Sequence, residues 1–517
     1  MAEKVYKVAM KNNEREFFFV ALLTILGMAV RLSGPLSASF PLNDGGLFHQ
    51  MIVDLQNNNF ILPAVTTYNF AEIPFAYPPF AFYVYGLFSA SGIPLLKLMQ
   101  FLPALVTTFT IPAFYVLAKD LLNNKQQSLF GTMAFALLPR TFDWLIMGGG
   151  VTRSLGFLFA ILAIHQAFLL FTIPTSRNLI LTTLYSGLVV VTHPEAAVHT
   201  IIAAIFIFIW KDHTLKGIFR AGAVAFGTLI LSAPWWMTIL IKHGMAPLQA
   251  AQIAAQENSV NFILRIFTLI KFDLTDEPFM QVLAVIGLIG IFILLAQRKP
   301  ALPIWFVFIA LIEPRGGTLY MMLPLAMFIG VTFDQAILPI LKPQGDNSHA
   351  WAWNAFIGFF LLYGVINASV TASNITRQLT LTRSDLDAFA WVKANTPPDS
   401  QFILITQGFP LNDSTSEWFP VMAERPSLAT VFGYEWVNDD LFGARVEQYQ
   451  KLQTCMMQDT ACINQWAQRY NQELSYIYLQ KSHGDTSVQP PLYISLINSP
   501  EFKSIFNSEN IEIFIKK

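Results

Sequence analysis

The chain has 517 residues, of which 54% are hydrophobic and only 13% are charged, and its mean hydropathy is +0.48. An ordinary soluble domain carries about 25% charged residues, so the composition excludes that class and indicates an integral membrane protein. The formal net charge of −1 offers no basic surface and argues against nucleic acid as a partner.

The N-terminal residues before the first apolar run are basic, with Lys4, Lys7, Lys11 and Arg15. The run itself, FFFVALLTILGMAV at 17–30, is not followed by a small-residue cleavage site. This pattern favours a retained span over a signal peptide. Because basic residues beside a span mark its cytoplasmic side, we expect the N-terminus in the cytoplasm.

A helix needs about 20 mainly apolar residues to cross a bilayer, and the chain offers eleven such runs. They lie near 17–34, 95–118, 127–147, 153–173, 178–195, 197–211, 219–241, 278–297, 301–314, 318–340 and 351–372. Most Lys and Arg residues near span ends fall in the loops that this count places inside. The exceptions are Lys97, Arg140, Lys242, Lys271 and Arg315. We therefore predict a polytopic α-helical domain over 1–372 in the plasma membrane, with the C-terminus outside.

Two predicted outer segments are long, 35–94 and 242–277. The first contains the turn PLNDGG and the stretch YPPFAFYVYGLF at 77–88, which is too short to cross and whose double proline indicates a helix start. We expect that helix to lie at the membrane surface. The second reads as two amphipathic pieces, LQAAQIAAQ and NFILRIFTLIKF, which suit the membrane surface and a lid that closes over a site.

From about Ser384 the composition changes to that of a soluble domain. Ser384 and Asp387 resemble a capping box that opens the helix DAFAWVKA, and the helix LYISLI comes later in the chain. Three apolar runs are typical of buried strands: QFILIT, SYIYLQ and IEIFIK. We therefore expect an extracytoplasmic α/β domain over 373–517.

The only two cysteines, Cys455 and Cys462, both lie in that domain. Outside the cytoplasm they can form a disulfide that closes a short loop. The alternative is two free thiols packed in a core.

Ionisable residues of interest gather at the predicted outer ends of the spans. They are Asp44 and His49, Glu72, Arg140 and Asp143, Arg153, His193 and Glu195, Asp273, Asp276 and Glu277, and Glu313 and Arg315. Ionisable groups beside strongly apolar sequence usually face a shared polar interior. We therefore expect several of them to line one cavity.

Purely structural interpretations of these residues remain open. Asp44 is a good turn residue, and Arg315 can extend its charged end to the membrane interface. His193 before proline can terminate a helix, and Asp143 can pair with Arg140 three residues away. For Arg153, an expected position at the positive end of a helix favours a partner anion.

The layout resembles the GT-C glycosyltransferases, polytopic membrane enzymes that take a sugar from a polyprenyl phosphate or pyrophosphate carrier. The features in common are Asn43-Asp44 after the first span, the YPPF helix, Asp143, the stretch PRGGTLYMMLP and an outer C-terminal domain. The chain looks most like the protein O-mannosyltransferase and lipid A aminoarabinose transferase branch, which has an Asp-Glu pair where this chain has Asn43-Asp44. The WWD signature of oligosaccharyltransferases is missing, and the nearest sequences are EWFP at 417–420 and GYEW at 433–436.

The resemblance implies an inverting enzyme that moves a sugar from a polyprenyl-phosphate donor to a hydroxyl of an extracytoplasmic glycan, lipid or protein in the cell envelope. Phosphate is already a good leaving group, so one carboxylate suffices, and Asp44 would be the general base. Arg315, with Arg153 as second candidate, would bind the donor phosphate. Asp143 would position the acceptor or hold Mg²⁺ or Mn²⁺ with Asp44, although no cofactor is certain. Further substrate contacts are expected from Asn43, Glu72, Tyr77, His193 and Glu195.

Two other classes compete with this interpretation. A catalytically inactive scaffold would keep the fold and bind a lipid-linked glycan or a partner protein, and the missing second acid beside Asp44 supports it. A transporter or flippase would need ionisable residues near the bilayer midplane, broken helices and repeated halves, and the sequence shows little of these. Mutation of Asp44 separates the enzyme from the scaffold.

Overall fold

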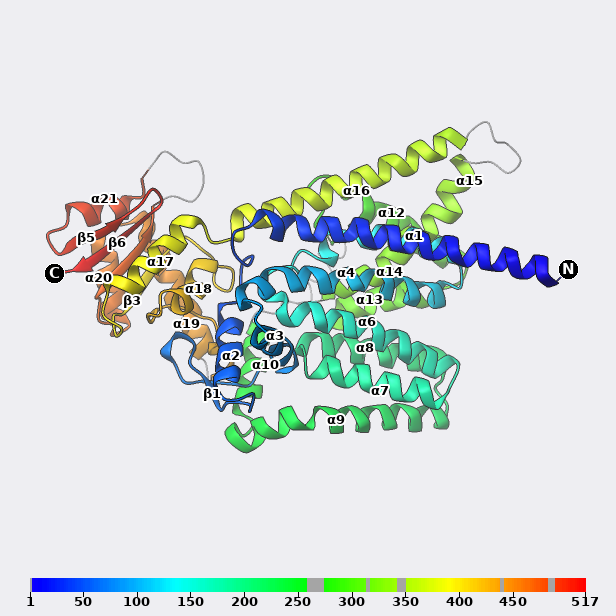
Figure 1. Cartoon of the computed structure of the whole chain (residues 1–517), viewed down its shortest axis with the longest axis horizontal. Helices are drawn as coiled ribbons and strands as arrows, with labels where there is room; N and C mark the ends of the chain where they lie inside the picture. The colour runs from blue at the N-terminus through cyan, green and yellow to red at the C-terminus, as the bar shows by residue number, and fades with distance from the viewer. Residues whose placement is uncertain (1, 258–273, 313–316, 342–349, 438–440, 482–488) are drawn as a thin grey trace.

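In the computed structural model the described residues are 2–257, 274–312, 317–341, 350–437, 441–481 and 489–517. The chain is mostly helical, and Figure 1 shows long helices lying side by side, with the N-terminus at one end and a C-terminal β-sheet at the other. Arg315, the peptide NFILRIFTLIKF and Glu313 fall outside the described residues.

Each of the eleven apolar runs contains a helix. These helices are α1 (Ala2–Ser37), α4 (Leu95–Leu122), α5 (Lys125–Leu137), α6 (Gly150–Thr172), α7 (Ser176–Val190), α8 (Pro194–Lys211), α9 (Leu215–His243), α12 (Val282–Ala296), α13 (Ala301–Ile312), α14 (Gly317–Thr332) and α16 (Ala350–Leu379). By length and composition, seven helical stretches of the described chain can cross a membrane. The predicted count of eleven crossings is therefore supported only in part, because α5, α7, α12 and α13 have 12 to 15 residues.

The run 127–147 shows why apolar composition overestimates helix length. Helix α5 ends at Leu137, and Pro139 opens the 3₁₀ turn η2 (Pro139–Thr141). The apolar residues that follow, including Phe142 and Ile146, are fully buried within the protein. Their hydrophobicity therefore reflects a packed loop between α5 and α6 and not contact with lipid.

The helical core is built around α6 and α14. Helix α6 packs against α4, α7 and α8, and α14 packs against α5, α12 and α13. After α14 the chain continues through a π-helical turn, η3 (Phe333–Ile337), into α15 (Leu338–Leu341). Most residues of α14 are buried. A helix that is apolar all round, as this one is, packs against other parts of the protein on all sides.

The long segment between α1 and α4 folds into small elements beside this core. It contains α2 (Gly46–Asn57), a two-stranded sheet of β1 (Val65–Thr66) and β2 (Ile73–Pro74), the turn η1 (Tyr68–Phe70), and α3 (Phe80–Ala90). Helix α3 begins directly after Pro79, as the double proline predicts. Helix α10 (Ala246–Glu257) contains the predicted amphipathic piece LQAAQIAAQ.

The C-terminal segment combines helices with a four-stranded sheet of order β3-β4-β6-β5. Strand β3 (Phe402–Ile405) runs parallel to β4 (Tyr476–Gln480), while β6 (Ile511–Lys516) is antiparallel to β4 and to β5 (Phe502–Asn507). The three strands expected from sequence are present. Strand β5 was not predicted, because its sequence FKSIFN is largely exposed and lacks an apolar run. The helices of this segment are α17 (Arg383–Asn395), α18 (Ser414–Met422), α19 (Leu441–Thr454), α20 (Thr460–Arg469) and α21 (Pro491–Asn498), with the turns η4 (Tyr434–Trp436) and η5 (Cys455–Met457).

The capping box of α17 lies two residues before the predicted one. Thr382 and Asp385 form it, and not Ser384 and Asp387. The backbone N–H of Thr382 donates to Oδ2 of Asp385 at 2.9 Å, while Oδ1 of Asp385 accepts from the hydroxyl of Tyr478 at 2.8 Å. This register buries Asp385 with partners for both oxygens, whereas Asp387 is exposed.

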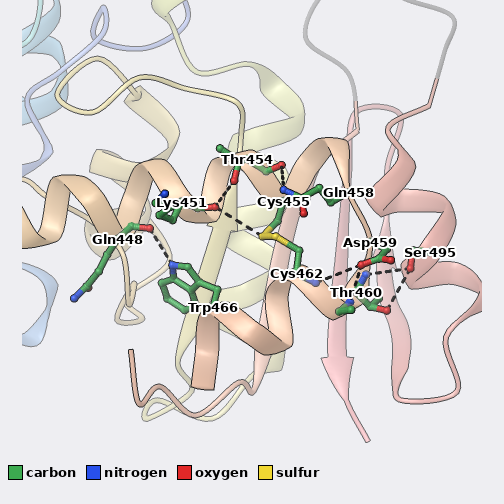
Figure 2. The surroundings of a disulfide bond; sticks show 11 residues. Gln448, Lys451, Thr454, Cys455, Gln458, Asp459, Thr460, Cys462, Trp466 and Ser495 are labelled. Carbon is green, nitrogen blue, oxygen red and sulfur yellow. Dashed lines mark hydrogen bonds between the residues drawn. A yellow bond between two sulfur atoms is a disulfide. The ribbon is translucent and has the colours of Figure 1, made fainter. Parts of the chain in front are cut away.

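Cys455 and Cys462 form a disulfide with their Cα atoms 5.5 Å apart. Figure 2 shows it joining η5 to α20, beside the hydrogen bond of 2.9 Å from Nε1 of Trp466 to the carbonyl of Gln448. The pairing expected from sequence is therefore present in the structure, and it fixes the loop between α19 and α20.

Candidate active site

The site is built on the buried turn that connects α1 to α2. Asn43 and Gly45 adopt positive φ angles of 53° and 131°, a region that suits Asn and Gly. The backbone N–H of Asn43 donates to the carbonyl of Leu379 at 3.0 Å, and its carbonyl accepts from Nε1 of Trp418 at 2.9 Å. The end of α16 and the helix α18 thus fix the turn from both sides.

Asp44 is held from the loop between α5 and α6. Its Oδ1 accepts from the backbone N–H of Gly149 at 2.8 Å, and the N–H of Gly148 donates to the carbonyl of Leu42 at 2.7 Å. A Cβ on Gly148 would lie 1.7 Å from the carbonyl oxygen of Asp44. Only glycine at 148 therefore lets the two segments approach this closely.

The second oxygen of Asp44, Oδ2, forms an ion pair with Nη2 of Arg153 in the first turn of α6. This is the partner anion that the position of Arg153 at a helix start favours. Nη1 of Arg153 also donates to the carbonyl of Trp144 at 3.2 Å, and its guanidinium lies 5.8 Å from the centre of the Trp144 ring. Asp44 is only 8% exposed, whereas the Arg153 side chain is 27% exposed, so the carboxylate is shielded from water while the guanidinium remains accessible from the cavity.

The loop between α5 and α6 is anchored by Arg31, a buried cation of α1. Its Nη1 donates to the carbonyl of Ala136 at 2.7 Å, its Nη2 donates to Oγ1 of Thr141 at 3.1 Å, and its guanidinium lies 5.0 Å from the Phe142 ring centre. Both terminal nitrogens of the guanidinium are bonded in this way, while the buried Nε has no hydrogen-bond partner among the described residues. Arg31 therefore fixes the loop that presents Gly149 to Asp44.

Asp143 lies in the same loop but does not pair with Arg140. The guanidinium of Arg140 instead forms an ion pair with Asp276, with Nη2 at 2.7 Å from Oδ1. Burial raises the pKa of the Asp143 carboxyl well above its usual range; Arg140 opposes this, and a hydrogen bond with Asp276 adds to it. Burial therefore favours the neutral form of the Asp143 carboxyl.

A cavity of about 360 Å³ brings five of the predicted site residues together: Asp44, Asp143, Arg153, His193 and Glu195. Residues 318–320, which follow Arg315 in the sequence, also line it. Glu417 and Glu435 of the C-terminal segment complete its acidic lining.

A second cavity, of about 540 Å³, shares six lining residues with the first: Phe48, Arg153, His193, Glu195, Leu411 and Glu435. Its remaining wall is rich in aromatic rings: Tyr77, Trp235, Trp436 and Phe442. The Tyr77 hydroxyl and Oγ1 of Thr152 lie 3.1 Å apart. The structure therefore has an acidic cavity that joins an aromatic one.

The other predicted site residues have different places. Asn43 is buried beneath the turn, where its Nδ2 donates to Sδ of Met147 at 3.2 Å. Glu72 is exposed and lines neither of these cavities. His193 begins a helix and does not terminate one: it is the N-cap of α8, with its Nδ1 accepting from the N–H of Ala196 at 3.3 Å.

The described residues do not fit a divalent cation held by Asp44 and Asp143. Both oxygens of Asp44 are engaged, one by a backbone N–H and the other by a guanidinium. Asp143 is bonded to the N–H of Trp144 and to Asp276. Within the described chain, no group of three or more His, Cys, Asp or Glu residues could hold a metal ion.

Sequence comparisons return nothing: no protein-family model matches the chain, and no curated protein matches it. Solved structures do. The archaeal oligosaccharyltransferase AglB from Archaeoglobus fulgidus, in complex with an inhibitory peptide and a dolichol-phosphate, aligns with a TM-score of 0.54 at 14% identity, over 91% of this chain and 70% of that one. The A. fulgidus oligosaccharyltransferase in complex with Zn and sulfate aligns with a TM-score of 0.54 at 14% identity, over 89% and 68%.

The arabinofuranosyltransferase AftD from Mycobacteria gives a TM-score of 0.51 at 15% identity, covering 96% of this chain but only 41% of the longer enzyme. AglB and AftD are both GT-C membrane glycosyltransferases. The chain has a GT-C fold. At these identities the similarity establishes the fold and not the activity, and the O-mannosyltransferase-like branch remains a prediction.

The GT-C fold places the Asp44 turn, the loop between α5 and α6 and the C-terminal segment around one cavity. Sequence reasoning missed Glu417 as a site residue. Glu417 lies in the sequence EWFP, which is only an imperfect match to WWD. Nothing in that sequence indicates a contact with the Asp44 turn, more than 370 residues earlier.

Proposed function

We propose that the chain is an inverting glycosyltransferase that transfers a sugar from a polyprenyl-phosphate donor to a hydroxyl of an extracytoplasmic acceptor. The observation that carries this proposal is the ion pair between the buried Asp44 and the partly exposed Arg153 at the wall of a polar cavity in a GT-C fold. A carboxylate and a guanidinium in contact can serve as the base for a hydroxyl and the clamp for a phosphate.

The chemistry follows from how the pair is held. The acceptor hydroxyl gives its proton to Oδ2 of Asp44, its oxygen bonds to the anomeric carbon, and the bond from that carbon to the carrier phosphate breaks. Arg153 neutralises the charge that develops on the phosphate. As the guanidinium turns to the phosphate, Oδ2 becomes free to accept the proton of the hydroxyl, while the N–H of Gly149 keeps the carboxylate in place.

The neighbouring groups take supporting roles. Arg315 is proposed as a second phosphate ligand, because residues 318–320 line the cavity directly after it in sequence. The aromatic cavity is proposed as the acceptor side, with Tyr77 and Glu195 as contacts. Asp143 is proposed to position the acceptor from the wall of the first cavity.

The topology is part of the proposal. Eleven crossings with the N-terminus in the cytoplasm place residues 373–517 outside the plasma membrane as a domain of their own. The disulfide between Cys455 and Cys462 supports this orientation, because such bonds persist in oxidising compartments.

The inactive-scaffold alternative is weakened by the position of residue 43. An acid at 43 is the group that the resemblance leads one to expect, but the Asn43 side chain points to Met147 and does not line the cavity. Asp44 thus lines the polar cavity without a contribution from residue 43.

The test is turnover of polyprenyl-phosphate sugars by the purified full-length protein in lipid nanodiscs. Asp44→Asn should lower kcat by about 10²–10⁴-fold, the contribution of a general base, and keep donor binding. Arg153→Ala should weaken donor binding as well. Asp387→Asn and Arg383→Ala, both exposed on α17, are the matched controls. If wild type binds carrier lipid but turns over no donor with any acceptor, and Asp44→Asn behaves identically, the scaffold becomes the better explanation.

A further inference from the structure

Helix α2, which follows the Asp44 turn, lacks a cap of its own. Its N-cap is Gly45, which has no side chain to accept a hydrogen bond. The first N–H groups of a helix need acceptors, normally a Ser, Thr, Asp or Asn side chain at that position. Because the turn is buried, water cannot freely replace such an acceptor.

The acceptor comes from the other end of the chain. Oε1 of Glu417, in α18, accepts from the backbone N–H of Gly45 at 3.0 Å and from that of Leu47 at 3.3 Å, across 372 and 370 positions of sequence. Glu417 is 3% exposed. Its carboxyl group therefore does for α2 what an N-cap side chain does in an ordinary helix.

Further contacts hold α18 against the turn. The carbonyl of Glu417 accepts from the Tyr68 hydroxyl at 2.7 Å, and Trp418 donates from Nε1 to the carbonyl of Asn43 at 2.9 Å. A Cβ on Gly46 would lie 2.5 Å from the Glu417 carbonyl oxygen, so α18 approaches α2 as closely as glycine allows. The backbone on both sides of Asp44 is thus bonded to one segment of α18.

We propose that Glu417 is a positioning residue for Asp44: it caps α2 from the C-terminal segment and so fixes the carboxylate in the orientation that its role as base requires. The inference rests on the proposed function of Asp44. It makes α18 part of the apparatus that sets the turn, although Glu417 itself need not touch the reacting atoms.

The surroundings of the second oxygen of Glu417, Oε2, bear on whether the carboxyl caps α2 as a neutral acid or as a carboxylate. Oε2 is buried and has no hydrogen-bond partner among the described residues. The charged and titratable groups around the carboxyl come from several elements: Asp44 of the turn, His49 of α2, Tyr68 of η1, Arg153 of α6 and Glu435 of η4. Burial, followed by the negative charge of Asp44, raises the pKa of Glu417 well above its usual range, against the opposing effect of the two N–H groups and Arg153.

A neutral Glu417 suits the site better than an ionised one. A second anion beside Asp44 would compete for Arg153 and repel the donor phosphate. A carboxylic acid still accepts from the two N–H groups through Oε1 and keeps the cap. Function should therefore persist below the raised pKa of Glu417 and fall as pH rises through it.

The experiment compares the pH dependence of kcat and donor KM for wild type, Glu417→Gln, Glu417→Ala and the control Glu473→Gln, an exposed carboxyl, in nanodiscs. An amide mimics the neutral acid, so Glu417→Gln should stay within about threefold of wild type at pH 7 and lose the alkaline fall. Glu417→Ala leaves two N–H groups without an acceptor and should lower kcat about 10²-fold through displacement of Asp44. Donor KM should change much less.

Two results would overturn the inference: a Glu417→Gln variant as inactive as Glu417→Ala at every pH, or one with an unchanged alkaline fall. Amide hydrogen exchange provides a readout that does not depend on turnover. Glu417→Ala should speed exchange at Gly45 and Leu47, while Glu473→Gln should not. If wild type turns over no donor, the proposed function has failed, and hydrogen exchange alone tests whether Glu417 caps α2. Unchanged exchange at the amides of Gly45 and Leu47 in Glu417→Ala would then show that it does not.

Discussion

Gly149 provides a direct test of the Asp44–Arg153 pair, because one added methyl group would separate the two without changing any charge. A Cβ on Gly149 would lie 2.3 Å from Oδ2 of Asp44 and 2.6 Å from Nη2 of Arg153. The carboxylate therefore has to move by about 1 Å to reach an ordinary contact distance. The backbone of Gly149 is αR, with φ of −64°, so alanine causes no backbone strain there.

The expected effect of Gly149→Ala is large on catalysis and modest on stability. A displacement of about 1 Å in a catalytic group costs about 10²-fold in rate. Overpacking lowers the free energy of unfolding by about 1–3 kcal/mol. The smaller conformational freedom of alanine in the unfolded chain raises it by about 0.4–1 kcal/mol. The free energy of unfolding should thus fall by roughly 1–2 kcal/mol, well short of global unfolding.

The assay measures kcat, donor KM and thermal unfolding of Gly149→Ala in nanodiscs. The control is Gly222→Ala in α9, where a Cβ meets no atom within 4 Å; its activity should equal wild type and its stability should rise slightly. Wild-type kcat in a folded Gly149→Ala protein would refute the reasoning, because it would show that turnover does not depend on the placement of Oδ2.

Three further predictions follow from the same contacts. Arg153→Lys keeps the positive charge but loses the planar guanidinium that can bind two phosphate oxygens at once. Donor KM, measured by titration with donor, should therefore rise about tenfold, a larger factor than the fall in kcat. An unchanged donor KM would show that Arg153 does not bind the phosphate. Burial raises the pKa of Asp143 and so favours the neutral carboxyl that Asp143→Asn mimics, and kcat of this variant at pH 7 should stay within about threefold of wild type; a loss of 10²-fold or more would mean that Asp143 works ionised. Cys455→Ser removes the disulfide to Cys462, which closes a loop across seven positions of sequence. The free energy of unfolding, measured by calorimetry, should fall by about 2 kcal/mol, and a reductant should lower that of wild type by the same amount. An unchanged free energy of unfolding in both experiments would show that the disulfide does not form.

Hydropathy predicts where the helices are but less well where they end. Each apolar run of about 20 residues contains a helix, because burial in lipid or protein requires apolar side chains in both cases. For the same reason the sequence cannot distinguish a lipid-facing helix from a packed loop, as the buried residues Phe142 and Ile146 show. The four-stranded sheet was predictable through its three buried strands, and β5 was not.

The candidate site was predictable where one of its residues lies next to a recognisable break in the sequence pattern. Asp44 follows the first span and is flanked by turn-forming residues, and Arg153 stands at an unfavourable end of a helix. The sequence did not show which residue each charged side chain contacts. Arg140 could pair locally with Asp143, yet its partner is Asp276, 136 positions away. Glu417 bonds to backbone N–H groups, which every residue but proline has, so its sequence carries no sign of that contact.

The balance of charge in the cavity explains why burial matters to the proposed reaction. Five carboxyl groups line it, from Asp44, Asp143, Glu195, Glu417 and Glu435, and the described lining contributes only two guanidinium groups, Arg140 and Arg153. With every acid ionised, such a cavity would repel a phosphate donor. Burial raises the pKa of both Asp143 and Glu417 well above their usual range, which favours their neutral forms and lowers the negative charge that a phosphate would meet in the cavity. Arg140 is already paired with Asp276, so in the proposed reaction Arg153 is the guanidinium of the described lining that turns from Asp44 to the incoming phosphate, and neutral forms of the two buried acids favour this step.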